Sequence, residues 1–205
     1  MKKLVLIMLV AMLLMTGAAQ AQEEGLPDPG VTPDSPLYFL DTIGENISLL
    51  FAFSAEAKAQ KASEIASEKL AETKAMADKG NEEGVEKAAG RYSEMMSTAA
   101  KSLAAAAQSG EGFGVALSEL IAKATSIHLS VLTDVYERVP DQAKPSIERA
   151  MQESTRGQQE ALNAVSSERR GEVEREIEQS QQELQERLDG LRQEGKPIPD
   201  VQILN

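Results

Sequence analysis

The chain has 205 residues with 33 acidic and 21 basic side chains, a formal net charge of -12, no cysteine, no tryptophan and one histidine. Without cysteine there are no disulfides, thiolate metal sites, cysteine nucleophiles or lipid-modified cysteine anchors, and one histidine excludes a multi-histidine metal centre. The acidic balance argues against nucleic-acid binding, which requires a positive surface. We therefore expect no nucleic-acid partner and no cofactor.

Residues 1–21 have the three parts of a secretory signal peptide. A basic start at residues 2–3 is followed by an apolar run over residues 4–15 and by an Ala-x-Ala cleavage signal that ends at Ala21. The apolar run is shorter than the roughly 20 residues of a membrane-spanning helix, which disfavours the alternative of a signal anchor. We predict cleavage near Ala21 and a soluble mature chain, secreted or extracytoplasmic, with no membrane span.

Residues 22–35 form an acidic leader rich in proline and glycine, which is predicted to be an extended linker because it cannot propagate a helix. Ser35 and Pro36 are predicted to be the N-cap and first residue of a helix that runs to about Phe51. Ser54 is predicted to cap the next helix. The leader lacks the alternating acidic pattern of a calcium-binding loop, so we interpret its carboxylates as solvated.

Most aromatic side chains gather around the first predicted helix. They are Tyr38, Phe39, Phe51 and Phe53. We interpret them as large side chains that fix this helix against the alanine-rich remainder, and a binding groove is the alternative. Asn46 begins a glycosylation sequon, but its place within a helix favours an unmodified side chain.

Further helices are predicted over residues 55–79, over 82–108, from the end of a glycine loop at 109–114 to about 139, and from 140 onward. The helix over 82–108 has a heptad seam, made of Val85, Ala89, Tyr92, Met96, Ala99, Leu103 and Ala106. No segment has the period-two alternation of a strand. The predicted fold class is all-α: an antiparallel bundle of four to five long helices over residues 36–165, then a C-terminal helical extension over 166–194 and a tail over 195–205.

The extension has a narrow apolar stripe in a surface rich in Glu, Gln and Arg. The stripe consists of Val173, Ile177, Leu184, Leu188 and Leu191. It is compatible with docking on the bundle, with self-association through 166–194 as a short coiled coil, or with a free solvated helix. Its acidic charge disfavours binding to an anionic membrane.

Several segments resemble one known family. They are Pro33-Asp34-Ser35-Pro36-Leu37-Tyr38-Phe39-Leu40, Glu68-Lys69-Leu70-Ala71-Glu72 and Val139-Pro140-Asp141-Gln142-Ala143-Lys144. These segments resemble the exported helical proteins grouped as domain of unknown function 5667, and the likeness covers about residues 26–165. The resemblance implies an exported, elongated helical domain and brings no established activity.

His128 is the one candidate for a metal or proton site. Helical periodicity places it in an apolar stripe, made of Leu117, Leu120, Ile121, Ala124, Ile127, Val131 and Val135. A histidine there could titrate near neutral pH, or bind a metal together with carboxylates of other helices. We favour the alternative, a buried ring that hydrogen-bonds to a neighbouring carbonyl, carboxylate or tyrosine, and therefore expect no metal site.

No other motif predicts chemistry. The methionines beyond the signal peptide are too scattered for a Cu(I) site and are interpreted as core; they are Met76, Met95, Met96 and Met151. The glycine loop lacks the ending of a phosphate-binding loop, and no Gly-x-Ser-x-Gly elbow occurs. We therefore expect a noncatalytic exported protein with a binding or structural role at the cell envelope or surface, whose partner is an envelope or extracellular protein. The alternative is a pH- or divalent-metal-sensing protein centred on His128.

Overall fold

The computed structural model describes residues 25–109 and 115–201, and these residues form six α-helices and no strand. The helices are α2 (Tyr38–Leu50), α3 (Ala55–Asp78), α4 (Glu82–Ser109), α5 (Val115–Arg138), α6 (Lys144–Ala164) and α7 (Ser167–Gln193). The predicted all-α class is confirmed. The predicted signal peptide, the glycine loop beyond Ser109 and the last residues of the tail lie outside the described residues.

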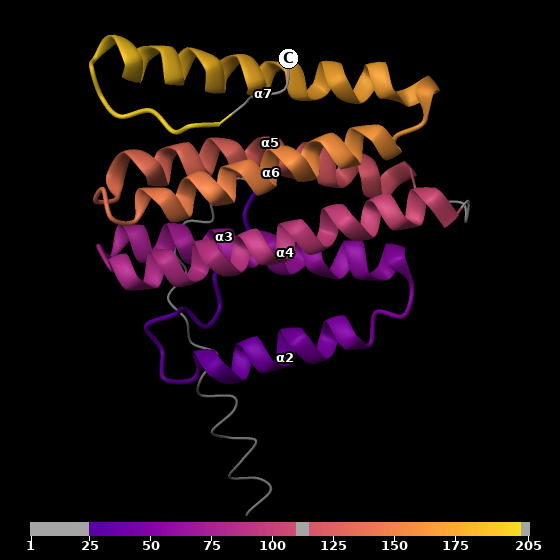
Figure 1. Cartoon of the computed structure of the whole chain (residues 1–205), viewed down its shortest axis with the longest axis horizontal. Helices are drawn as coiled ribbons and strands as arrows, with labels where there is room; N and C mark the ends of the chain where they lie inside the picture. Colours follow the sequence, from indigo (N-terminus) through magenta and orange to yellow (C-terminus); the bar gives the residue numbers. More distant parts are fainter. Residues whose placement is uncertain (1–24, 110–114, 202–205) are drawn as a thin grey trace, which may run out of the picture.

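The helices stack in layers (Figure 1). Helix α3 packs along α4, α5 packs along α6, and α4 joins these two pairs through a long contact with α6. Helix α7 covers α5 on one side of the molecule, and α2 lies on α3 at the other. No helix among the described residues is long and apolar enough to cross a membrane.

Local sequence signals explain both ends of α3. The Ser54 hydroxyl accepts a hydrogen bond from the Ala57 backbone amide at 3.0 Å, so the predicted cap of α3 is confirmed. Gly80 ends α3 at a positive φ of 65°, a conformation that glycine adopts without strain. The Ser35 hydroxyl accepts a hydrogen bond from the Leu37 backbone amide at 3.2 Å, but the helix start predicted at Ser35 and Pro36 is wrong. A turn closes from Tyr38 N–H to the Ser35 carbonyl, and α2 begins only at Tyr38, without a side-chain cap.

The heptad seam predicted on α4 is confirmed, because every one of its residues is buried. Three of the seven seam residues are alanine, whose small side chain lets α3 and α6 approach α4 closely. Helix α6 approaches α4 closely at Gly157, where an added Cβ would lie 2.6 Å from the Met96 sulfur. A larger residue at this position would require the Met96 side chain to move.

The stripe predicted on α5 is only partly confirmed. Ile121, His128 and Val135 are buried, but Leu120 is 62% exposed and Ile127 lies at the surface. The reason is that α5 packs against three helices, α3, α6 and α7, so its buried face is wider and rotated relative to one simple stripe. That face includes the small polar residues Ser118, Thr125, Ser126 and Thr133.

Helix α7 is docked on the rest of the chain. All five residues of its apolar stripe are buried, and they belong to the same core clusters as residues of α3 to α6. Ion pairs add to the contact, including Arg187 with Glu137 at 2.6 Å and Arg169 with Glu119 at 2.6 Å. Of the three alternatives for this segment, the structure has α7 docked on the bundle. The apolar stripe of α7 packs against the other helices of the same chain.

We predict that Gly157→Ala destabilises the protein by about 1 kcal/mol or more, because the added methyl group overpacks the α4–α6 contact. The matched control is Gly90→Ala. Gly90 is also within a helix, but nothing lies within 4 Å of its added Cβ, so this change should stabilise by up to about 1 kcal/mol. Chemical denaturation measures both values, and equal effects at the two positions would contradict the close contact.

Candidate functional site

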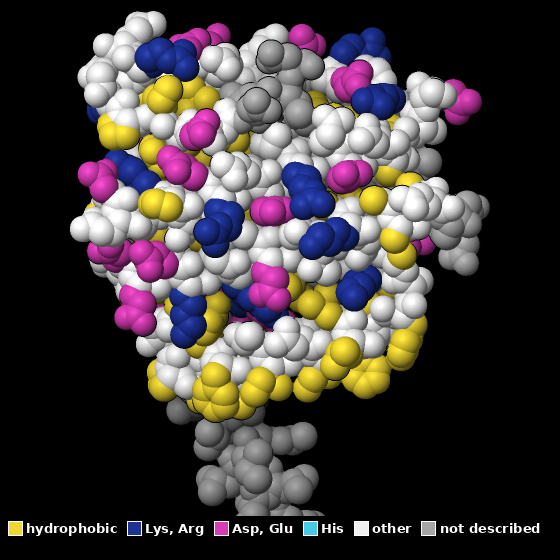
Figure 2. Space-filling model, in the orientation of Figure 1, with side chains coloured by type: hydrophobic (Ala, Val, Ile, Leu, Met, Phe, Trp, Pro, Cys, Tyr) yellow, Lys and Arg dark blue, Asp and Glu magenta, His cyan; other side chains and the backbone are white. Residues whose placement is uncertain are grey.

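Helix α2 carries its apolar side chains on the outside of the molecule. The exposed large apolar residues of this region are Leu37, Phe39, Leu40, Ile43, Ile47, Leu50, Phe51 and Phe53. Figure 2 shows them as a continuous apolar border over α2. We call these eight residues the α2 outer face. An ordinary surface helix has the opposite orientation, with its apolar stripe toward the core.

The aromatic side chains therefore do not fix α2 to the other helices, and that prediction is wrong for three of the four. Phe51 is 68% exposed and Phe53 is 88% exposed, and their rings pack edge to face at 6.1 Å between centroids. Phe39 is exposed as well. Only Tyr38 is buried. The outer face thus presents the aromatic surface to whatever lies outside the chain.

The inner side of α2 is acidic and contacts one buried and one partly buried cation. The Lys69 ammonium of α3 is fully buried and donates a hydrogen bond to Asp41 at 2.9 Å. It also pairs with Glu45 of α2 and with the equally buried Glu72 of α3. The Arg91 guanidinium of α4 pairs with Glu45 at 3.2 Å. We call these five residues the charge cluster.

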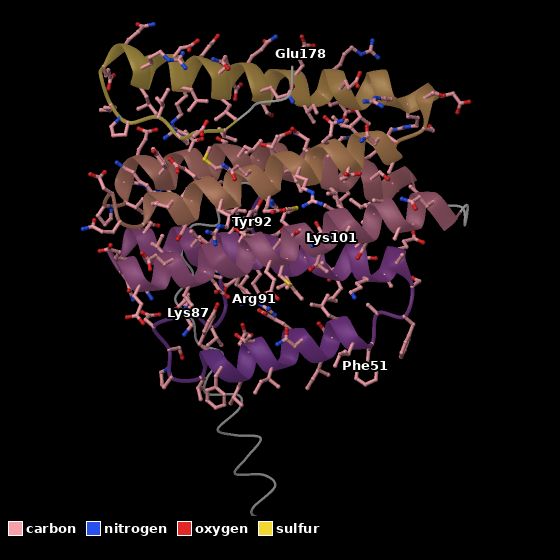
Figure 3. The ribbon with its side chains drawn as sticks, in the orientation of Figure 1. Phe51, Lys87, Arg91, Tyr92, Lys101 and Glu178 are labelled. Atoms are coloured by element: carbon pink, nitrogen blue, oxygen red, sulfur yellow. The ribbon has the colours of Figure 1, made fainter. Side chains whose placement is uncertain are left out.

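Two further contacts hold α2 in place. The Tyr38 ring lies 5.0 Å from both the Lys69 and the Lys87 ammonium groups, a distance at which a cation is attracted to an aromatic face. The side-chain oxygen of Asn46 accepts a hydrogen bond from Arg91, so the glycosylation sequon lies against α4 at this residue. Figure 3 shows Lys87 and Arg91 on the side of α4 that faces α2, and Phe51 on the far side of α2.

The pKa values follow from burial and from the hydrogen bonds of the cluster. Burial opposes the charge on Lys69, but its hydrogen bonds to Glu45, Glu72 and Asp41 outweigh burial and raise its pKa. Burial raises the pKa of Glu72 to about 7, although the Lys69 ammonium acts in the opposite direction. Glu72 is therefore more easily protonated than an ordinary glutamate, because its carboxylate is fully buried.

Asp41, Glu68 and Glu72 bring carboxylate oxygens within 4.8 Å of one another, and among the described residues this is the grouping with the spacing of a metal site. The Lys69 ammonium already bonds to two of these three carboxylates. A metal ion there would have to compete with a buried cation of the protein itself. The geometry therefore favours an internal ion cluster over a metal centre.

His128 lies in the core between α3 and α4 side chains. Its Nε2 is 3.2 Å from the Ser67 hydroxyl and its Nδ1 is 3.1 Å from the Tyr92 hydroxyl, so both ring nitrogens have a hydroxyl partner. Burial lowers the pKa of His128 to about 4. No carboxylate is among its hydrogen-bond partners in the described part of the chain. The ring thus hydrogen-bonds to a tyrosine, which is one of the partners expected for a buried histidine. The structure does not bring His128 together with the charge cluster.

The four methionines all lie in one buried core cluster together with apolar side chains, as their interpretation as core predicts. Sequence reasoning missed the charge cluster instead. A signal was present, because Ile65, Lys69, Glu72 and Met76 follow each other in steps of four, three and four on α3. Charged residues in phase with an apolar stripe are the pattern of a buried ion pair.

The fold and the charge cluster define a class: an all-helical protein in which buried charges pair with one another and the first described helix turns its apolar side outward. The chain belongs to the family described as Domain of unknown function (DUF5667), whose model matches residues 30–142. The predicted family is confirmed, and the match includes all of α2, the charge cluster and His128. No curated protein and no solved structure matches the chain.

We predict that Lys69→Met destabilises the docking of α2 by about 3–5 kcal/mol, because the change leaves buried carboxylates without their cation. Hydrogen exchange should show faster exchange of α2 amides, with smaller changes in α5 and α6. The control is Lys61→Met, which removes an exposed ion pair with Glu64 and should cost less than about 1 kcal/mol. Unchanged α2 protection in Lys69→Met would contradict the cluster as its anchor.

We also predict opposite pH effects for two buried groups. Glu72 has a raised pKa, so the folded state holds more protons than the unfolded state between pH 4.5 and about 7, and its contribution to stability falls as pH rises. His128 has a lowered pKa, so between about pH 4 and 6.5 the unfolded state holds more protons, and its contribution rises with pH. Each effect is at most about 1.4 kcal/mol per pH unit.

Two variants separate these effects. Relative to the parent protein, Glu72→Gln should gain stability as pH rises from 4.5 to 6.5, and His128→Gln should lose it. Denaturation curves at several pH values measure both differences. NMR of the single histidine, which needs no assignment, should show a neutral ring throughout pH 5 to 8. A titration midpoint inside that range would contradict the burial effect.

Proposed function

We propose that this protein is a noncatalytic binding protein of the cell envelope or cell surface, and that the α2 outer face is the surface by which it binds. On this proposal an antiparallel bundle of α3 to α6, with α7 as an extension, is the scaffold that presents α2. The observation that carries the proposal is the orientation of α2. A helix whose acidic side is bound to Lys69 and Arg91 leaves its apolar side free for a partner.

The size of the outer face supports binding. With roughly 150–250 Å² for an aromatic side chain and somewhat less for leucine or isoleucine, the eight residues leave on the order of 1,000 Å² of apolar surface uncovered. The largest apolar patch of a typical monomer is roughly 300–600 Å². A patch above that range is typical of a surface that another molecule covers. The signal-like N-terminus supports a place outside the cytoplasm for this interaction.

The described residues favour binding over catalysis. The one histidine is buried with both nitrogens engaged, and the chain has no cysteine. The buried lysine, which could act as a base only if neutral, has a raised pKa and remains charged. Two observations disfavour the alternative of pH or metal sensing at His128. Its pKa lies below the range in which it would sense protons, and both ring nitrogens already have hydroxyl partners.

The test replaces three exposed residues of the outer face together, as Leu40→Gln, Ile47→Gln and Phe51→Gln. Because these side chains are largely exposed, we expect the unfolding free energy to change by no more than about 1 kcal/mol. The control is Leu120→Gln, which removes a similarly exposed leucine from α5.

Binding is read out with a photoreactive amino acid at Leu50, introduced into the chain in its native envelope. We expect a cross-linked product from Leu50, its loss in the triple variant, its retention in Leu120→Gln, and no product from Gln185 on α7. Equal labelling from Leu50 and Gln185 would contradict the proposal. So would a triple variant that unfolds as easily as a variant of the core.

A further inference from the structure

We propose that the partner of the α2 outer face is a second copy of this chain, so that two α2 helices pack against each other in an antiparallel, two-fold symmetric dimer. The inference rests on the proposed binding role of this face and names its occupant. Five features of α2 support a dimer: the spacing of its apolar residues, the glycine among them, the apolar area that it exposes, the inward orientation of its charged residues and its outermost position in the fold.

Four of the eight residues of the outer face, together with Gly44, follow a heptad. Leu37, Leu40, Gly44, Ile47 and Phe51 occur in steps of three, four, three and four, which is the spacing of a helix that packs along another helix. A lipid surface or an irregular groove requires no such regular seam. The seam predicted and found buried on α4 has the same spacing, but on α2 it has no partner within the described chain.

Gly44 lies at the middle of this seam. Nothing lies within 4 Å of a Cβ added there, so the glycine is not required by any contact inside the chain. In a two-fold antiparallel pair with full overlap, the middle residue meets its own copy, and Leu37 meets Phe51 of the second copy. A glycine at the crossing point lets the two helix backbones approach closely.

The area is sufficient for a stable dimer. Covering most of the outer face on both copies removes roughly 1,500–2,000 Å² from water, which lies within the range of stable protein interfaces. A single short helix pair is held mainly by such burial, and three phenylalanines contribute a large share here. The self-complementary use of one patch is what a two-fold dimer requires.

The charge distribution permits the contact although each chain has a net charge of -12. The two acidic residues of α2, Asp41 and Glu45, both turn inward to Lys69. The seam itself therefore has no charged residue. Repulsion between copies then comes only from distant charges, which salt screens, so dimer formation should strengthen as salt increases.

The position of α2 leaves room for a second copy. Figure 1 shows α2 as the outermost layer on its side of the described molecule, with α3 and α4 behind it. The side chains of the seam point away from those helices, as the outward position of Phe51 in Figure 3 illustrates. A second copy can therefore meet α2 along its full length without touching α5, α6 or α7.

The first test measures mass in solution, using the naturally processed chain. Sedimentation equilibrium at micromolar concentrations should give twice the monomer mass, with a dissociation constant that decreases from low to high salt. Ile47→Lys places a charge in the seam and should give a monomer with unchanged helical content. Gln185→Lys on α7 is the control and should remain dimeric. A monomeric parent chain at all these concentrations would overturn the inference.

The second test uses the absence of native cysteine. Gly44→Cys should form a disulfide between two copies under mild oxidation, because the two positions meet at the symmetry axis. Gly171→Cys on α7 has equally open surroundings and should stay monomeric. Adding Ile47→Lys to Gly44→Cys should abolish the cross-link. Equal cross-linking at the two cysteine positions would show random collision and overturn the inference.

The photoreactive Leu50 separates this inference from the proposed function. A product of two copies of this chain supports both. A product with another protein overturns the dimer but leaves the binding role of the outer face intact. Flotation of the monomer with zwitterionic vesicles, lost in Ile47→Lys, would name a lipid surface and overturn the dimer as well. The absence of any specific product from Leu50 overturns both.

Discussion

The docking of α2 depends on the burial of one ammonium group. Lys69 has no exposed surface, and removing a charge from water is costly unless opposite charges replace the lost hydration. Glu72 of its own helix supplies one partner, and α2 supplies two further carboxylates, Asp41 and Glu45. Because α2 must turn its acidic side to Lys69, its apolar side has to face outward. The exposed aromatic surface is thus a consequence of the buried charge.

This arrangement separates two kinds of contact in one small protein. The helices α3 to α7 are held by apolar burial, with Ala, Leu and Met in interlocking clusters. The contact of α2 is held mainly by ion pairs and by a tyrosine beside two lysines. Ion pairs need specific geometry, so they fix which way α2 faces more strictly than a hydrophobic contact of the same size would. Apolar burial therefore holds α3 to α7 together, whereas charged contacts hold α2.

Much of the fold was predictable from the sequence because it depends on periodicity. The seam of α4, the cap at Ser54 and the helix end at Gly80 are local signals that tertiary structure did not override. The orientation of α2 was not predictable in the same way, since amphipathicity predicts a buried apolar side and α2 has the reverse orientation. The information was in α3, where Lys69 and Glu72 occupy core positions and require charged partners from another helix. A reading that treats each helix separately misses such a requirement.

The two outer layers of the molecule are unlike each other. On one side α2 presents leucine, isoleucine and phenylalanine, and on the other α7 turns its glutamate- and arginine-rich surface to solvent, as Glu178 in Figure 3 illustrates. Because α2 contacts α3, and α7 contacts α5 and α6, these layers are separated by the whole core. The molecule is therefore asymmetric, with an apolar surface at α2 and a charged surface at α7. Whatever covers α2, the acidic surface of α7 faces away from that contact, and the molecule displays a charged side to its surroundings.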